Sequence, residues 1–175
     1  MPWCRCAWQR VAVVREQHRR RWSARASVAD EEYFEITIAD LAGRLPIHYA
    51  AADNEPELLR QLIASGQNVN AQEGQGWTPL HIAADGGSLE IAQILIDAGA
   101  DPNIVNRQYK TPLDKAVAAP KYCGIEAAKL IFLRGGDPFH EDDLRNTAIR
   151  YLERLDEDSA KKELLEFIRQ HDRAE

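Results

Sequence analysis

Residues 78–84 read Thr-Pro-Leu-His-Ile-Ala-Ala, and the chain repeats this stretch at a fixed distance. Leu-Pro-Ile-His-Tyr-Ala-Ala stands 33 residues earlier, at 45–51, and Thr-Pro-Leu-Asp-Lys-Ala stands 33 residues later, at 111–116. A fixed period of this size is typical of one small structural unit stacked on copies of itself. The sequence therefore predicts a solenoid, and a solenoid offers an extended surface for function.

Within the unit at 78–110, each residue type has a physical reason for its place. Thr78 is expected to cap the first helix, because a threonine oxygen accepts a backbone amide that the helix leaves free. Pro79 then occupies the first helical position, where its missing N–H costs nothing. One face of this helix is apolar, with small residues that let a second helix approach: Leu80, Ala83 and Ala84.

The second helix of this unit is predicted between two glycine breaks. Gly86-Gly87 ends the first helix, and Gly99 ends the second with a left-handed residue. Ser88 is expected to cap the second helix. Its apolar stripe follows helical spacing and consists of Leu89, Ile91, Ala92, Leu95 and Ile96.

The other units depart from this pattern at particular positions. Leu45 stands where the pattern has threonine, so its helix lacks a cap, while Asn54 is expected to cap the next helix. The third unit holds three extra residues, placed within 118–124 between its two helices. The shifted period predicts a fourth unit at Thr147. The last helix is expected at 161–170, with Leu164, Leu165 and Ile168 facing inward.

The repeated Thr-Pro-Leu-His-Ile-Ala-Ala stretch, Gly-Ala-Asp-Pro-Asn at 99–103 and the 33-residue period resemble the ankyrin repeat. The resemblance covers about residues 40–171 and implies an all-α solenoid of about four helix-turn-helix units with hairpin fingers. We expect the domain to occupy residues 30–171, with units at 45–77, 78–110, 111–146 and 147–171.

Residues 1–29 differ from the repeats, since they hold seven arginines, no lysine and one acid, Glu16. Three interpretations stay open: a disordered arginine-rich tail, an amphipathic presequence, and a segment upstream of the true start. After this extension, alternating apolar residues at Phe34, Ile36 and Ile38 predict a short extended segment over 31–41. We expect it to help cover the first repeat.

The whole chain of 175 residues carries 22 Lys and Arg against 28 Asp and Glu, a net charge of −6. Because the N-terminal extension is basic, the acidic balance lies in the repeats. An acidic body is a poor nucleic-acid binder and suits a basic protein surface better. No stretch is apolar for long enough to span a membrane. The three cysteines, an odd number, fit a reducing compartment, so we expect a cytoplasmic protein.

The resemblance implies a non-catalytic module without cofactor or small-molecule substrate, monomeric when unbound, that binds a partner protein through its fingers and the concave face of its first helices. Some similar stand-alone bacterial proteins act as inhibitors or immunity partners of a toxin, and we expect a role of this kind. The positions selected as partner-binding are Arg44, Asp53, Gln75, Trp77, Asp85, Arg107, Gln108, Tyr109, Lys110 and Leu144. Their neighbours on the same surface are Leu41, Ala42, Ala52, Gly74, Gly86, Asp143 and Asn146.

Two aromatic residues stand out among these positions. Trp77 occupies a finger position that requires no large residue, and Tyr109 replaces the glycine expected there. Exposed aromatic residues dominate interface energies, at roughly 2 kcal/mol or more each when well buried. The structural alternative is that the two rings pack against each other or along the finger. Arg107 and Lys110 flank Tyr109, so the third finger is suited to a local acidic contact.

Other chemistry has weaker support in the sequence. A hydrolase or metal site would use His48, His81 and Cys123, but recurring histidines one repeat apart lie roughly 10 Å from each other, too far to share a metal. In the family this histidine is structural, bonding within and between repeats. The arginine-rich tail offers a third hypothesis, a salt-sensitive nucleic-acid contact.

Several polar residues are expected to be ordinary surface or turn residues. Glu141, Asp142 and Asp143 are predicted to form a solvated acidic face. Asn70 and Asn103 are predicted as turn asparagines, although in animal members of the family this position can be a hydroxylation target.

Overall fold

A computed structural model describes residues 39–119, 124–154 and 159–172 of the chain. These residues all belong to the second of the two units into which the chain divides, Ala39–Glu175. The predictions for the extension 1–29 and for the extended segment at 31–38 lie outside the described residues. Leu41, at the end of that segment, is part of a turn.

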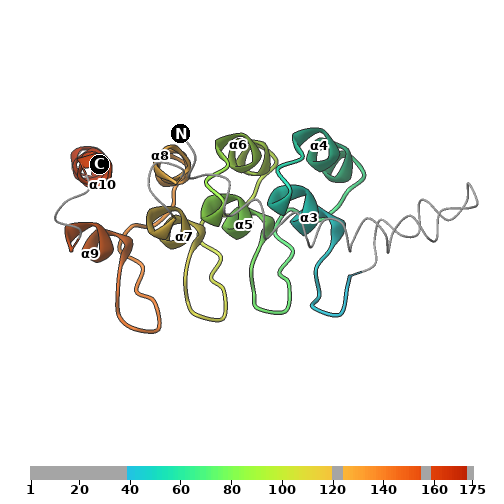
Figure 1. Cartoon of the computed structure of the whole chain (residues 1–175), viewed down its shortest axis with the longest axis horizontal. Coiled ribbons are helices and arrows are strands. Elements are labelled where there is room, and N and C mark those ends of the chain that lie inside the picture. Colours follow the sequence, from blue (N-terminus) through green and yellow to red (C-terminus); the bar gives the residue numbers. More distant parts are fainter. Residues whose placement is uncertain (1–38, 120–123, 155–158, 173–175) are drawn as a thin grey trace, which may run out of the picture. The chain divides into compact units, whose positions relative to one another are not determined.

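The described residues form eight helices and no strand, which confirms the all-α prediction. The helices alternate between two rows, drawn one above the other in Figure 1. The row next to the fingers, here called the inner row, contains α3 (Pro46–Ala52), α5 (Pro79–Asp85), α7 (Pro112–Ala118) and α9 (Ala148–Glu153). The outer row contains α4 (Pro56–Ala64), α6 (Leu89–Asp97), α8 (Ile125–Leu133) and α10 (Ser159–Asp172).

Each inner helix packs on the outer helix that follows it, and α3, α5 and α7 also pack on the inner helix of the next repeat. Leu80 and Ala84 of α5 and Ile91 and Leu95 of α6 are completely buried in this packing. Burying a leucine or isoleucine side chain contributes about 1.5–3 kcal/mol. Every repeat therefore depends on its neighbours for part of its core, as expected for a solenoid.

The predicted threonine caps are confirmed. The Oγ1 atoms of Thr78, Thr111 and Thr147 each accept the amide three residues on, at 3.3, 3.2 and 3.1 Å. Leu45 has no side-chain cap, as its residue type requires. Thr147 caps α9 three residues later than the period alone would place it, as the shifted period predicted.

Two cap predictions on the outer row are wrong. Ser88 precedes α6 but does not cap it, because its hydroxyl donates to Asn54 Oδ1 of the preceding repeat. Asn54 does not cap α4, where Glu55 holds the cap position without a side-chain bond. Asn54 instead adopts a positive φ of 54°, which asparagine tolerates better than most residues. The two side chains connect neighbouring repeats.

The remaining helix predictions need smaller corrections. Leu89 does not belong to the buried stripe of α6, since it is 44% exposed at the first turn of the helix. The extra residues of the third unit do lie between α7 and α8, although residues 120–123 fall outside the described part. The last helix is longer than predicted, Ser159–Asp172, and its Leu164, Leu165 and Ile168 are buried.

Asparagines at equivalent turn positions link successive repeats through both ends of their side-chain amides. Asn70 donates to the Gly99 carbonyl at 3.3 Å and accepts the Asp101 amide at 2.8 Å. Asn103 makes the same two bonds one repeat on, to the Gly135 carbonyl at 2.8 Å and from the Asp137 amide at 2.9 Å. These residues are therefore structural links between repeats.

We predict that Asn103→Ala lowers the free energy of unfolding by about 1–2 kcal/mol, because two hydrogen bonds of typical net strength are lost. Urea unfolding at neutral pH measures the change. Gln108→Ala removes another exposed amide, one that makes no such link, and should leave stability within about 0.5 kcal/mol. Equal stabilities of the two variants would contradict the linking role.

Candidate functional site

Each finger is organised by one side-chain oxygen at its base. The base residues are Asp40, Glu73, Asn106 and Asp142, and they are 33 residues apart except for Asp142, which the three extra residues of the third unit displace. In each finger this oxygen accepts the backbone amides two and four residues further on, at distances of 2.8–3.3 Å. The chain thus turns back on itself over four residues, here called the fingertip: 41–44, 74–77, 107–110 and 143–146.

The third residue of every fingertip has a positive φ. Gly43 and Gly76 adopt φ values of 76° and 79°, in a region that glycine enters without strain. Tyr109 and Arg145 adopt 54° and 56° at the equivalent positions of the third and fourth fingers. A residue with a side chain is strained in this conformation, by about 1–2 kcal/mol.

Backbone hydrogen bonds join each fingertip to the next. The amides of Gly74, Arg107 and Asp143 donate to carbonyls of the preceding finger, at 2.6, 3.0 and 3.4 Å. At the first junction only glycine fits, because a Cβ on Gly74 would lie 2.6 Å from the Ala42 oxygen. The four fingertips are therefore held in a fixed row.

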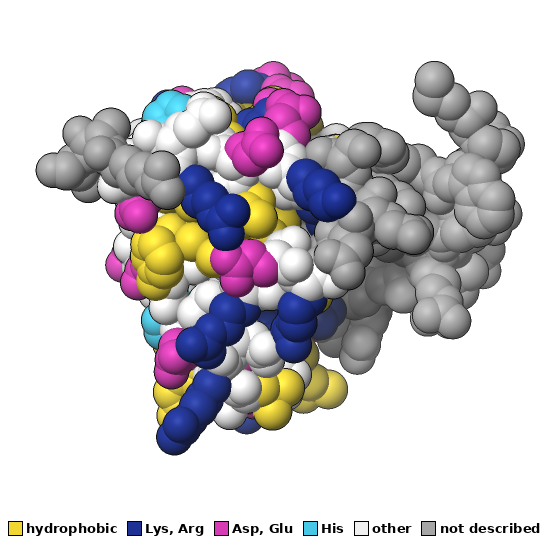
Figure 2. All heavy atoms as spheres, turned by 90° about the vertical axis from the view of Figure 1, so that its left-hand side faces the viewer, with side chains coloured by type: hydrophobic (Ala, Val, Ile, Leu, Met, Phe, Trp, Pro, Cys, Tyr) yellow, Lys and Arg dark blue, Asp and Glu magenta, His cyan; other side chains and the backbone are white. Residues whose placement is uncertain are grey.

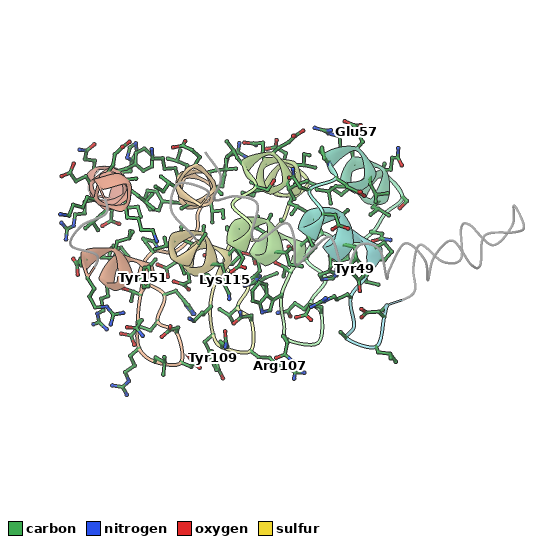
Figure 3. The ribbon with its side chains drawn as sticks, viewed as in Figure 1. Tyr49, Glu57, Arg107, Tyr109, Lys115 and Tyr151 are labelled. Atoms are coloured by element: carbon green, nitrogen blue, oxygen red, sulfur yellow. The ribbon has the colours of Figure 1, made fainter. Side chains whose placement is uncertain are left out.

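Large side chains are exposed on this row. Leu41 is fully exposed, Leu144 is 73% exposed and Tyr109 is 60% exposed. In Figure 3, Tyr109 and Arg107 lie at the ends of the fingers, Lys115 lies between the fingers and the helices, and Glu57 lies on the outer row. None of the three large side chains belongs to the buried core.

Trp77 does not share this exposure. Its half-buried ring lies under Lys115 of α7, with Nζ 3.9 Å from the ring centroid, and 6.2 Å from the ring of His81. Lys115 also approaches Asp85 at 3.9 Å, and burial lowers the pKa of its amine while Asp85 opposes the shift. The structural alternative for Trp77 therefore has support, with Lys115 rather than Tyr109 as its partner.

The other predicted positions lie on the same surface but differ in their exposure and in their contacts. Arg44 and Lys110 each approach a carboxylate of the next finger, Glu73 and Asp142, at 3.8 Å. Asp53 ends α3 and is half-buried. The remaining selected or neighbouring positions are mainly exposed: Ala42, Ala52, Gln75, Gly86, Arg107, Gln108 and Asp143 are exposed, and Gly74 and Asn146 are half-buried.

The prediction of a solvated acidic face at 141–143 is wrong for Asp142. Its side chain is only 7% exposed and serves as the base of the fourth finger. The residue-by-residue prediction also omitted Lys115 and Arg145. Aligning Arg145 with Tyr109 across the three extra residues would have found it, whereas the place of Lys115 over Trp77 depends on how α7 packs.

The recurring histidines are bonded at both ring nitrogens. His81 Nδ1 accepts the Thr78 amide at 3.2 Å, and Nε2 lies 2.9 Å from the Lys110 carbonyl of the next finger. His48 makes the equivalent bond to Leu45 and approaches the Ala71 carbonyl at 3.0 Å. Among residues 39–119, 124–154 and 159–172, no group of three metal-ligating side chains is close enough to hold a metal. Cys123 lies outside the described residues.

In the third unit Asp114 replaces the histidine. Its Oδ2 accepts the Thr111 amide at 2.8 Å and the Thr111 hydroxyl at 2.9 Å, which reproduces the bonds of the imidazole Nδ1. Burial raises the pKa of this carboxyl, while the bonds from Thr111 oppose the rise.

Among the helices that the structure describes, none has the length and apolar character of a membrane span.

The family model described as ankyrin repeats (3 copies) matches residues 47–142, more than half of the chain. This span includes the inner helices α5 and α7, all of α3 except Pro46, and the second and third fingertips. No curated protein matches the sequence.

We predict that His81 makes the fold sensitive to acid. Burial is the main cause that lowers the pKa of its imidazole from 6.5 to about 4, and Lys115 contributes. The unfolded chain therefore binds a proton that the folded chain excludes, so stability is full above pH 6.5 and falls as the pH drops toward 4. The loss amounts to about 3 kcal/mol, at about 1.4 kcal/mol per pKa unit.

Urea unfolding of the native chain and of His81→Gln, at several pH values between 4 and 7, measures this dependence. The variant should be less stable at pH 7 and should lose less stability on acidification. His171→Gln, which changes an exposed histidine of α10, should retain the native slope. Identical slopes for the native chain and His81→Gln would contradict the assignment.

Proposed function

Because this chain belongs to the ankyrin-repeat family, we propose that it binds a partner protein through its row of four fingertips and the adjoining inner helices. Ankyrin repeats are protein–protein interaction modules, and such modules are generally non-catalytic. The partner surface proposed here is the row whose backbone is fixed by the finger bases and by the bonds between neighbouring fingers. A fixed surface loses little conformational entropy on binding, which favours affinity.

The observation that carries this proposal is the pair Tyr109 and Arg145. Both stand at a positive φ where the first two fingers have glycine, so the fold alone would favour glycine at these positions. Strained residues of this kind persist where function requires the side chain. Tyrosine and arginine are also the residue types, with tryptophan, that most often dominate interface energies.

Within this proposal the chain acts by binding and carries out no reaction of its own. The histidines of the metal or hydrolase hypothesis already use both ring nitrogens in bonds that support the repeats. We propose that the chain acts as an inhibitor or immunity-type partner, which covers the functional site of the protein that it binds. We further propose that the unbound chain is monomeric and cytoplasmic.

We predict that Tyr109→Gly and Leu144→Ser each weaken partner binding by about tenfold or more, as expected when an interface residue worth 1.4 kcal/mol or more is removed. Tyr109→Gly should not lower stability, because it relieves the strain at a positive φ. Affinity capture from a source extract with quantitative mass spectrometry identifies the partner, and calorimetry with the purified partner then gives the affinities.

Leu133→Ser is the matched control. Leu133 is 56% exposed at the end of α8 in the outer row, so this variant makes the same chemical change away from the fingers. It should bind as the native chain does. A partner lost on Leu133→Ser and retained on Leu144→Ser would move the binding surface to the outer row and sink the proposal.

A further inference from the structure

We propose that the surface which meets the fingertips is an acidic segment of a protein that carries apolar side chains. This inference rests on the proposed binding function and adds the chemistry of the partner. The charge of the fingertips is opposite to that of the whole chain, whose net charge is −6. The fingertip residues include four cations and one acid: Arg44, Arg107, Lys110, Arg145 and Asp143.

The two carboxylates that approach fingertip cations are used within the fingers. Glu73 and Asp142 have side chains only 5% and 7% exposed. In each, one oxygen accepts two backbone amides, and the other approaches a cation of the preceding fingertip. These acids therefore offer little negative charge to a partner.

Two of the four cations are free of such pairing. Arg107 and Arg145 are exposed, and neither approaches a carboxylate within the described residues. The exposed arginines of the outer row differ in this respect, since Arg60 lies 2.6 Å from Glu57 and Arg134 lies 2.9 Å from Asp97. An unpaired guanidinium can bind a carboxylate through two parallel hydrogen bonds.

The apolar part of the surface lies among the same residues. Tyr109 and Leu144 belong to the third and fourth fingertips, which a backbone bond from Asp143 to Gln108 joins at 3.4 Å. Arg107 and Arg145 belong to these two fingertips as well. The joined tips thus present two cations together with two large exposed apolar side chains, and a partner must supply carboxylates and apolar contacts within one short segment.

A protein segment fits this surface better than a nucleic acid. A polyanion gains its affinity from many Lys and Arg contacts along its backbone and is repelled by an acidic body. Figure 2, which shows the face at the α9 and α10 end, has Asp and Glu side chains interspersed among the Lys and Arg, so the cations there form no continuous positive track. Local acidic and apolar groups on a protein would avoid this wider repulsion.

The test uses the full-length chain and synthetic labelled peptides of about 12 residues, since fingers about 10 Å apart and an extended chain rising about 3.3 Å per residue require this length. One peptide combines Glu and Leu, a second replaces each Glu by Lys, and a third replaces each Leu by Ser. Fluorescence anisotropy gives each affinity at two salt concentrations.

We expect the Glu–Leu peptide to bind most tightly and to weaken as salt increases. The double variant Arg107→Glu, Arg145→Glu should lose at least tenfold in affinity for this peptide and gain affinity for the Lys–Leu peptide. The control Arg60→Glu, Arg134→Glu makes the same charge change on the outer row and should bind the Glu–Leu peptide with native affinity. Circular dichroism confirms that each variant is folded.

Other results would overturn the inference in distinguishable ways. Tighter binding of the Lys–Leu peptide to the native chain, lost on Tyr109→Gly, would reject an acidic partner and leave the fingertip function standing. Binding of an oligodeoxythymidine that the double variant abolishes would assign the cations to nucleic acid. Failure of all three peptides to bind would reject the acidic, apolar segment, and the capture experiment with Leu144→Ser would then decide separately whether the fingertips bind a protein.

Discussion

The row of fingertips, which is the surface proposed for partner binding, depends on one hydrogen-bond arrangement, in which the base oxygen of each finger accepts two backbone amides. A turn of four residues directs two backbone amides inward, and unpaired amides would be costly in a partly buried position. The oxygens of Asp40, Glu73, Asn106 and Asp142 satisfy both amides in each finger. These bonds hold the turn through its backbone amides, and the four fingers share them although their fingertip side chains differ.

The second polar side-chain atom of each base residue is suited to the charge of the last residue in the preceding fingertip. Arg44 meets Glu73 and Lys110 meets Asp142, each at 3.8 Å. Between these pairs stand Trp77 and Asn106, which are both uncharged. The Asn106 amide nitrogen is buried without an acceptor among the described residues, whereas a carboxylate there would be a buried charge with no cation at the end of the preceding fingertip, which is Trp77. Electrostatic matching between neighbouring fingers thus accounts for the residue type at the base.

The sequence predicted those features that depend on a residue and its near neighbours. Threonine before proline gave the caps at Thr78 and Thr111, and the altered spacing gave the fourth unit at Thr147. The failed predictions involve contacts between repeats. Ser88 and Asn54 have the residue types of helix caps. The stacking of two repeats brings them together, so the Ser88 hydroxyl donates to the Asn54 side chain and neither side chain accepts a helix amide.

The candidate site divides in the same way. The finger positions follow from the period, and the pattern of glycines is enough to mark Tyr109 as an unusual residue at its position. What the sequence could not give was the state of each side chain. Trp77 and Tyr109 look equivalent as finger aromatics, yet Lys115 of the next helix covers Trp77 while Tyr109 stays 60% exposed. This difference arises from packing between residues that are far apart in the sequence.

Strain also separates the four fingers into two kinds. The first two use glycine at the positive φ, so their tips have the conformation that the fold favours and no side chain at that position. The third and fourth place Tyr109 and Arg145 there, at a cost to stability that an outward-facing side chain cannot recover within the folded chain itself. This cost in stability arises in the third and fourth fingertips. The same two fingertips contain Arg107 and Arg145, which approach no carboxylate within the described residues. Strain, exposure and charge therefore all support the proposal that the third and fourth fingertips contact the partner.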